Sequence, residues 1–233
     1  VEFTLEEVYE VIDAIDCNDF EHLSEELGDL LFQIIFYSQI GAEQKHFDFD
    51  DVISGVTAKL IRRHPHVFPN GTLDSSRLEI GDLDSDDINI DWEAIKKQER
   101  VRKGISRGLD DVPLALPALK RALKLQKRAA QTGFDWPTVD SVLSKVDEEF
   151  YELKVEINRA NVEGIEDELG DLLFTCVNLS RHLKVDPETA LRRSNDKFKR
   201  RFSIMESLAD DDNLSQYSLS ELESLWRKAK DLD

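Results

Sequence analysis

Two strings of carboxylates recur in this sequence at the same spacing. The string Glu-Leu-Gly-Asp-Leu-Leu-Phe occurs at 26–32 and again at 168–174, offset by 142 positions. An ExxE string precedes each copy, with fifteen residues between it and the following ExxD. Chance similarity would not hold four acids in register twice, so the sequence contains an internal duplication built around acid pairs. The acids are Glu7, Glu10, Glu26 and Asp29 in the first unit, and Glu149, Glu152, Glu168 and Asp171 in the second.

These acids have the types and spacing of metal ligands. Acids three positions apart project from the same side of a helix, so each string forms a pair aimed one way. Two antiparallel helices would bring two pairs together, and burying such charges uncompensated costs on the order of several kcal/mol each. A divalent cation removes that cost, and oxygen ligands favour Mg²⁺ or Mn²⁺. A single ExxE is usually a solvated helix face, so the duplication of both pairs is what favours a metal site.

Other site chemistries find less support. A di-iron bundle needs Glu-x-x-His pairs, and the sequence has none. It also lacks a Walker loop, a G-x-G-x-x-G string and a C-x-x-C pair. His64 and His66 flank Pro65, where such histidines are more often structural than ligand-binding. Gly28 and Gly170 each stand inside a predicted helix at a cost of about 1 kcal/mol relative to Ala, which either the site or close helix packing would explain.

Basic residues follow the acids in each unit. A predicted third helix carries Lys59, Arg62 and Arg63 in the first unit, and its counterpart carries Lys197, Arg200 and Arg201. Such a run is most often a surface face, but beside a bound metal it supplies what a polyphosphate needs. Thirty basic and forty-nine acidic residues give a net charge of −19, which disfavours nucleic acid and anionic membranes as partners. A small phosphorylated ligand fits better.

The periodicity of apolar residues predicts an all-α fold. No segment shows sustained β alternation, and the apolar steps are those of helices. The apolar run 30–36 predicts a helix enclosed by others, and Asp50 is the expected cap of the third helix. The helices are expected at about 5–15, 21–42, 50–63, 92–103, 117–131, 142–159, 164–183, 188–208 and 220–230.

The same pattern predicts a tandem arrangement of two units. We expect an N-terminal repeat at 1–70, an acidic linker with a connecting helix at 71–115, and a C-terminal repeat at 116–233. The first repeat is expected to be truncated at its start, because the chain begins at Val1. No signal peptide or bilayer-spanning run is visible. Cys17 and Cys176 form no CxxC pair, so we expect buried free thiols and a cytoplasmic protein.

Longer strings resemble the MazG family of nucleoside triphosphate pyrophosphohydrolases, especially its two-repeat bacterial members. The resemblance covers nearly the whole chain, and the ExxE plus ExxD set is the family's metal signature. It implies an all-α bundle that hydrolyses nucleoside triphosphates to monophosphate and pyrophosphate with Mg²⁺. It also implies a homodimer. The matching strings are at 5–10, 25–33, 62–68, 116–119 and 133–136.

The resemblance further implies roles for individual residues. All eight acids would bind metal, and Glu149 or Glu148 would accept the proton of the attacking water. Lys197 and Arg201 would hold phosphates with Arg200 nearby, and Trp136 would be available for stacking on a base. Trp226 and Lys230 match positions that reach the nucleotide and have no counterpart in the first unit, so the second site is expected to be the more active.

Two alternatives stay open at this point. One is a helical module that binds nucleotide or a partner protein without catalysis. The other is a phosphohydrolase that acts on nucleoside diphosphates or another phosphorylated metabolite, because the acids recognise metal and phosphate rather than a base.

Overall fold

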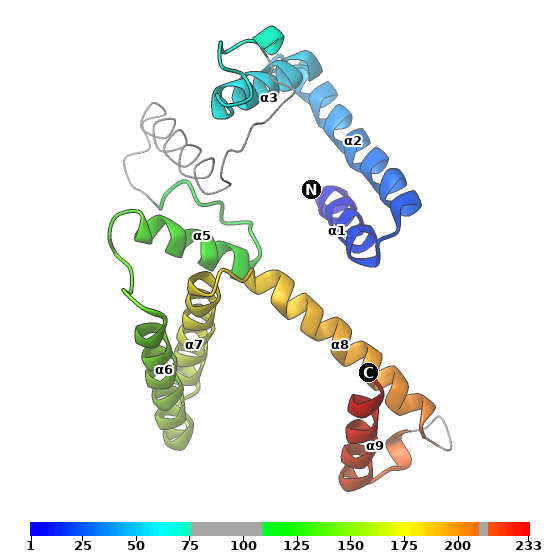
Figure 1. The fold of residues 1–233 in the computed structure, drawn as a ribbon, viewed down its shortest axis with the longest axis vertical. Helices are drawn as coiled ribbons and strands as arrows, with labels where there is room; N and C mark the ends of the chain where they lie inside the picture. Colours follow the sequence, from blue (N-terminus) through cyan, green and yellow to red (C-terminus); the bar gives the residue numbers. More distant parts are fainter. Residues whose placement is uncertain (76–108, 210–213) are drawn as a thin grey trace. The chain divides into compact units, whose positions relative to one another are not determined.

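The described part of the chain is built from α-helices. A computed structural model describes residues 1–75, 109–209 and 214–233 (Figure 1). These residues contain no β-strand, so the predicted all-α fold is confirmed. The predicted helix at 92–103 and most of the acidic stretch 73–91 lie outside the described residues. None of the helices in the described ranges combines the length and the hydropathy that a membrane span requires.

The chain divides into two compact units, residues 1–104 and 105–233. The finer division expected from the sequence, at 70 and 115, stays a prediction. In the first unit, α1 (Glu2–Cys17) packs along α2 (Phe20–Glu43), and α2 contacts α3 (Phe49–Arg63). All three helices begin and end within about three residues of the predicted positions.

The start of α3 differs from the prediction in its cap. Asp48 is the cap: its side chain accepts a hydrogen bond from the N–H of Asp51 at 2.9 Å. The side chain of Asp51 accepts one from the N–H of Asp48 at 3.1 Å, which completes a capping box. Asp50, the expected cap, is wrong because it already lies in the first helical turn.

The described part of the second unit contains a second hairpin and three further packed helices. α6 (Val139–Arg159) packs along α7 (Val162–His182), and α5 (Ala118–Ala130) contacts α7 and α8 (Pro187–Ser207). α8 pairs with α9 (Leu219–Leu232). Short 3₁₀ turns occupy Leu73–Ser75 and Leu214–Gln216.

Polar side chains fasten α5 to its neighbours. Gln126, which is buried, donates a hydrogen bond to the carbonyl oxygen of Phe174 on α7 at 2.8 Å. Lys120 pairs with Asp186, the N-cap of α8, at 2.6 Å. α5 thus fixes the junction where α7 passes into α8.

The two hairpins turn in the same way. Asn18 lies between α1 and α2 with φ of 55°, and Ala160 lies between α6 and α7 with φ of 53°. The two residues are 142 positions apart, which is the offset of the acid strings. Both adopt the left-handed conformation that ends a helix and reverses the chain. The duplication therefore extends to the backbone of the turn.

Among the described residues, the enclosed core of the second unit is small. Val142 on α6 and Val177 on α7 are buried, and Met205 on α8 packs against Leu225 and Ala229 on α9. These contacts hold helix pairs together and leave other apolar faces open.

Two expectations about burial are wrong. The centre of α2 was expected to be enclosed, but Phe32 is 60% exposed and Leu31 is 49% exposed. The reason is that α2 has only α1 and α3 beside it among the described residues of its unit. Cys17 and Cys176 are free, as expected, but both are exposed.

Candidate active site

The second hairpin brings acids from both of its helices together. Glu149 stands on α6, and Glu168 and Asp171 stand one turn apart on α7. One carboxylate oxygen from each lies within 4.8 Å of the others. Glu149 is only 5% exposed, whereas Asp171 faces solvent. We call these three residues the second acid cluster.

The first hairpin repeats this arrangement. Glu7 on α1 and Glu26 and Asp29 on α2 also place carboxylate oxygens within 4.8 Å of one another. Glu26 is the buried member, at 7% exposure, and the Nδ1 atom of His22 lies 3.2 Å from its Oε1. We call Glu7, Glu26 and Asp29 the first acid cluster.

Glu10 and Glu152, the fourth predicted acids of the two units, are not among the three closest carboxylates of each cluster, but their charges act on them. The pKa of Glu168 is raised mainly by burial and next by the negative charge of Glu152. Likewise, burial and then the charge of Glu10 raise the pKa of Glu26. In both clusters the acids therefore repel one another, and a cation between the helices would relieve that repulsion.

The glycines between these acids are not explained by packing within a unit. A side chain added at Gly28 or Gly170 would meet no atom within 4 Å of its Cβ in the described structure. Close packing against the other described helices, one of the two explanations considered, therefore does not account for these glycines. A helical glycine with open space beside it leaves room for a ligand or another molecule to approach the backbone.

The second acid cluster has a lysine beside it that the sequence reasoning missed. The Nζ atom of Lys145 lies 2.7 Å from Glu149 and 2.8 Å from Glu148. The hydrogen bonds that Lys145 donates to Glu148 and Glu149 raise the pKa of Lys145, so the group stays an ammonium ion. Because Lys145 and Glu149 are four residues apart on one helix, the spacing itself could have indicated this pair.

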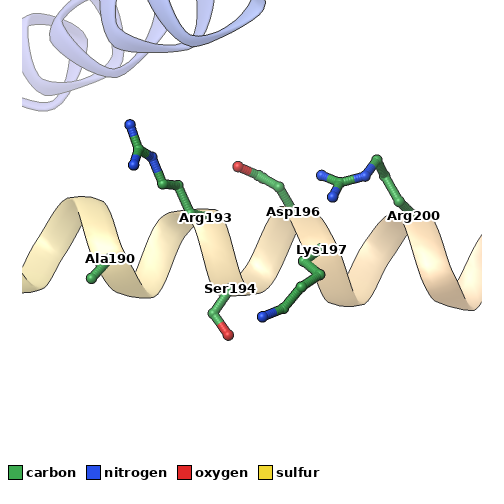
Figure 2. Close-up of a pocket in the computed structure, with 6 residues that line it drawn as sticks. All are labelled: Ala190, Arg193, Ser194, Asp196, Lys197 and Arg200. Carbon is green, nitrogen blue, oxygen red and sulfur yellow. The ribbon is translucent and has the colours of Figure 1, made fainter. Parts of the chain in front are cut away.

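The basic residues of α8 lie along that helix. Lys197 and Arg200 border a shallow surface pocket whose lining residues all belong to α8 (Figure 2). In Figure 2, Lys197 extends to one side of α8 and Arg193 to the other. Arg200 and Arg201 bind the side chain of Asp233, at 3.1 and 2.9 Å. The structure thus pairs these arginines with an acid after α9 and not with the second acid cluster.

The predicted nucleotide-binding residues of α9 have different surroundings. The ring of Trp226 lies 5.3 Å from that of Phe198 and packs against the α8–α9 core. Lys230 is exposed. Trp226 therefore holds α9 to α8 whatever else it contacts.

The segment before α6 is held by an ion pair that the sequence reasoning also missed. Asp135 accepts hydrogen bonds from Arg181, and its carboxylate lies 3.1 Å from His182 Nε2. The hydrogen bonds from Arg181 hold the pKa of Asp135 below its usual range. Trp136 stands next to this anchor, and its ring meets that of Phe134 edge-on at 6.5 Å.

In the first unit, the basic residues close the last turn of α3. Arg62 and Arg63 stand in the last turn, near the negative end of the helix, and Lys59 is exposed one turn earlier. The Nδ1 atom of His64 lies 2.8 Å from the carbonyl oxygen of Leu60. That contact gives His64 a structural role at the helix end.

A pair of helical hairpins that each gather carboxylates defines an all-α protein with two cation-attracting sites. The model of the MazG nucleotide pyrophosphohydrolase domain matches residues 1–68 and 137–203. The chain is 44% identical over 232 residues to the nucleoside triphosphate pyrophosphohydrolase of Escherichia coli K12, a match that covers 98% of this chain and 85% of that protein. It is 41% identical over 230 residues to the nucleoside triphosphate pyrophosphohydrolase/pyrophosphatase MazG of Thermotoga maritima, covering 98% and 84%.

The chain belongs to the MazG family, as its sequence motifs predicted. A protein of Bacillus subtilis, YabN, is also 43% identical to it over 235 residues, which make up 46% of that longer protein.

Proposed function

We propose that this chain hydrolyses nucleoside triphosphates to nucleoside monophosphate and pyrophosphate, with Mg²⁺ held by the acid clusters. The supporting observation is the acid triad on each hairpin, with oxygens within 4.8 Å, in a member of the MazG family. The 44% identity to an E. coli nucleoside triphosphate pyrophosphohydrolase supports the same reaction.

The residues present fit a hard divalent cation. Each cluster offers carboxylate oxygens from two helices, which is the donor type that Mg²⁺ prefers and that Mn²⁺ also accepts. Glu152 and Glu10 complete the two sets. When bound, Mg²⁺ would neutralise charge on the triphosphate and favour ionisation of the attacking water.

The chain's own acids supply the proton acceptor. We assign the role of proton acceptor to Glu149 or to Glu148. Of the two, Glu148 is exposed and therefore accessible to water. The water oxygen forms a bond to the α-phosphorus while its proton passes to the carboxylate. The bond from the α-phosphorus to the α–β bridging oxygen breaks, and pyrophosphate leaves with the bonding electrons.

The cations of α8 and α9 are proposed to bind the substrate. Lys197, Arg200 and Arg201 would hold phosphate oxygens, and the two arginines would exchange Asp233 for the triphosphate. Trp226, Lys230 and Trp136 would contact the nucleoside. Lys59, Arg62 and Arg63 would serve the first site, which lacks counterparts of Trp226 and Lys230, so we propose that the second site is the more active.

We propose that two copies of the chain associate through the apolar helix faces. Leu31 on α2 and Leu173 on α7 are equivalent residues of the two repeats, 49% and 53% exposed. Each lies two positions after the Asp of its acid string, on a part of its helix that the other described residues leave open. Apolar surface of this kind is typical of an interface.

The net charge of −19 supports a free nucleotide rather than nucleic acid as the substrate. Two free, exposed thiols are consistent with the reducing cytoplasm, which we propose as the location. Neither proposal includes a membrane partner.

The test is hydrolysis of a panel of nucleoside triphosphates with Mg²⁺, with pyrophosphate and orthophosphate resolved. Glu168→Gln is expected to lower kcat/KM at least about 100-fold, because it removes a ligand of the second acid cluster. Glu166→Gln, an exposed acid on the same helix, is the matched control and should retain activity.

Release of orthophosphate alone would contradict the proposed reaction and favour a different phosphohydrolase. No turnover with any triphosphate, with Mg²⁺ or Mn²⁺, would favour a binding module instead.

A further inference from the structure

Lys145 is the feature of the second acid cluster that the proposed mechanism leaves unused. Its ammonium group lies 2.7 Å from Glu149 Oε1 and 2.8 Å from Glu148 Oε1, and its side chain is 29% exposed. The side chain of Glu149 is only 6% exposed, so little water competes for that carboxylate. The pair is thus partly desolvated, unlike an ordinary surface ion pair.

Among the described residues, the first acid cluster has no lysine at the equivalent position, although His22 lies 3.2 Å from Glu26. At the offset of 142, Lys145 corresponds to Phe3, whereas Glu148 and Glu149 correspond to Glu6 and Glu7. Phe3 is 67% exposed and carries no charge. The two repeats therefore share their acids and differ in the cation that accompanies them.

The ammonium and a divalent cation compete for the same carboxylate. Glu149 is one of the three acids whose oxygens lie within 4.8 Å, so its charge is needed by any ion held there. An ammonium at hydrogen-bond distance neutralises part of that charge and repels a second cation. Glu148 lies at nearly the same distance and is exposed, so it can keep the lysine when Glu149 turns to the metal.

We infer that Lys145 is a built-in counter-ion of the second acid cluster, which a divalent cation must displace from Glu149, and that it thereby lowers the metal affinity of this cluster. Lys145 acts through Glu149 and is a positioning residue. The inference rests on the metal site of the proposed function. It adds that the two sites of one chain differ in how readily each takes up the ion.

Titration calorimetry of Mn²⁺ into the full chain tests this inference. The first acid cluster is disabled by Glu26→Gln, so the heat reports the second cluster alone. In this background, Lys145→Met is expected to bind Mn²⁺ about three- to tenfold more tightly, since the competing ammonium is gone. Lys145→Arg keeps the cation and is expected to stay within about twofold of the parent. Lys145→Gln is a second neutral variant, and far-UV circular dichroism confirms that each variant is folded.

Lys154→Met is the matched control. Lys154 is an exposed lysine nine positions further along α6, which places it on the opposite side of the helix. It removes the same charge from the chain and is expected to leave Mn²⁺ affinity within about twofold of the parent.

The possible failures are distinguishable. Unchanged or weaker Mn²⁺ binding in folded Lys145→Met and Lys145→Gln would overturn the role of Lys145 and leave the metal site standing. If Glu168→Gln, added to the Glu26→Gln background, does not reduce Mn²⁺ binding, the metal site itself is wrong and this inference falls with it.

Discussion

Asp135 fixes the segment that leads into α6. Its carboxylate binds the guanidinium of Arg181 and lies beside His182, both near the end of α7. Arg181 is held in turn by Asn178, a buried residue one turn earlier. Because Trp136 follows directly, this anchor decides where the proposed stacking side chain can reach.

We expect Asp135→Asn to lower the free energy of unfolding of the second unit by about 1.5–3 kcal/mol at pH 7, the range for hydrogen bonds to charged groups. The pKa of Asp135 is lowered in the folded state. Its stabilising effect is therefore fully present above the unfolded pKa of about 4 and is lost as pH falls through the lower folded pKa. Urea unfolding at pH 7 and at about pH 3 measures the difference.

Asp147→Asn, an exposed acid on α6, is the control and should change little at either pH. A loss of stability in Asp135→Asn that is equally large at acid pH would contradict the ion-pair explanation.

Some site residues were within reach of the sequence and others were not. Six of the eight predicted acids gather in the two acid clusters, as the register fixed by the duplication indicated, and the pairing of Lys145 with Glu149 was readable from helical spacing. Arg181 was not, because it meets Asp135 across 46 positions and only the packing of the segment before α6 against α7 joins them. The ion pairs of Asp233 with Arg200 and Arg201 depend in the same way on the pairing of α8 with α9.

At the scale of the helices, the cap of α3 stabilises the helix that carries the basic residues Arg62 and Arg63 at its other end. Asp48→Ala is expected to destabilise the first unit by about 1 kcal/mol, because it removes the side-chain oxygen that accepts a hydrogen bond from the N–H of Asp51. The measurement is the urea midpoint followed by circular dichroism at 222 nm. Asp50→Ala removes an acid from the same turn without removing a cap bond and should cost roughly a third as much. Equal effects would show that charge near the helix start matters more than the cap.

Helix positions were predictable because apolar spacing and caps are local. The start of α3 moved by one residue, because Asp48 and Asp50 could each serve as its cap. The burial of the α2 centre was not predictable. Its apolar run indicates that some surface should cover Phe32, but it does not say whether that surface belongs to the same chain. The open space beside Gly28 and Gly170 raises the same question.

At the scale of the whole molecule, the exposed apolar faces are expected to hold two copies together. Leu31→Glu and Leu173→Glu, made together, should shift the mass in solution from that of a dimer to that of one chain, because a buried charge would oppose association. Light scattering after size-exclusion chromatography measures the mass. Leu219→Glu, at an exposed position on α9, is the control and should leave the dimer intact. A parent protein with the mass of one chain would contradict the dimer.

The two free cysteines give this chain a natural pair of spectroscopic handles. Cys17 ends α1 in the first unit, and Cys176 lies within α7 in the second, so each hairpin carries a single exposed thiol. Spin labels attached to both would report the spacing of the two hairpins by electron resonance, without any engineered residue. Distances recorded with and without nucleotide would then show whether the two repeats move relative to each other as the substrate binds.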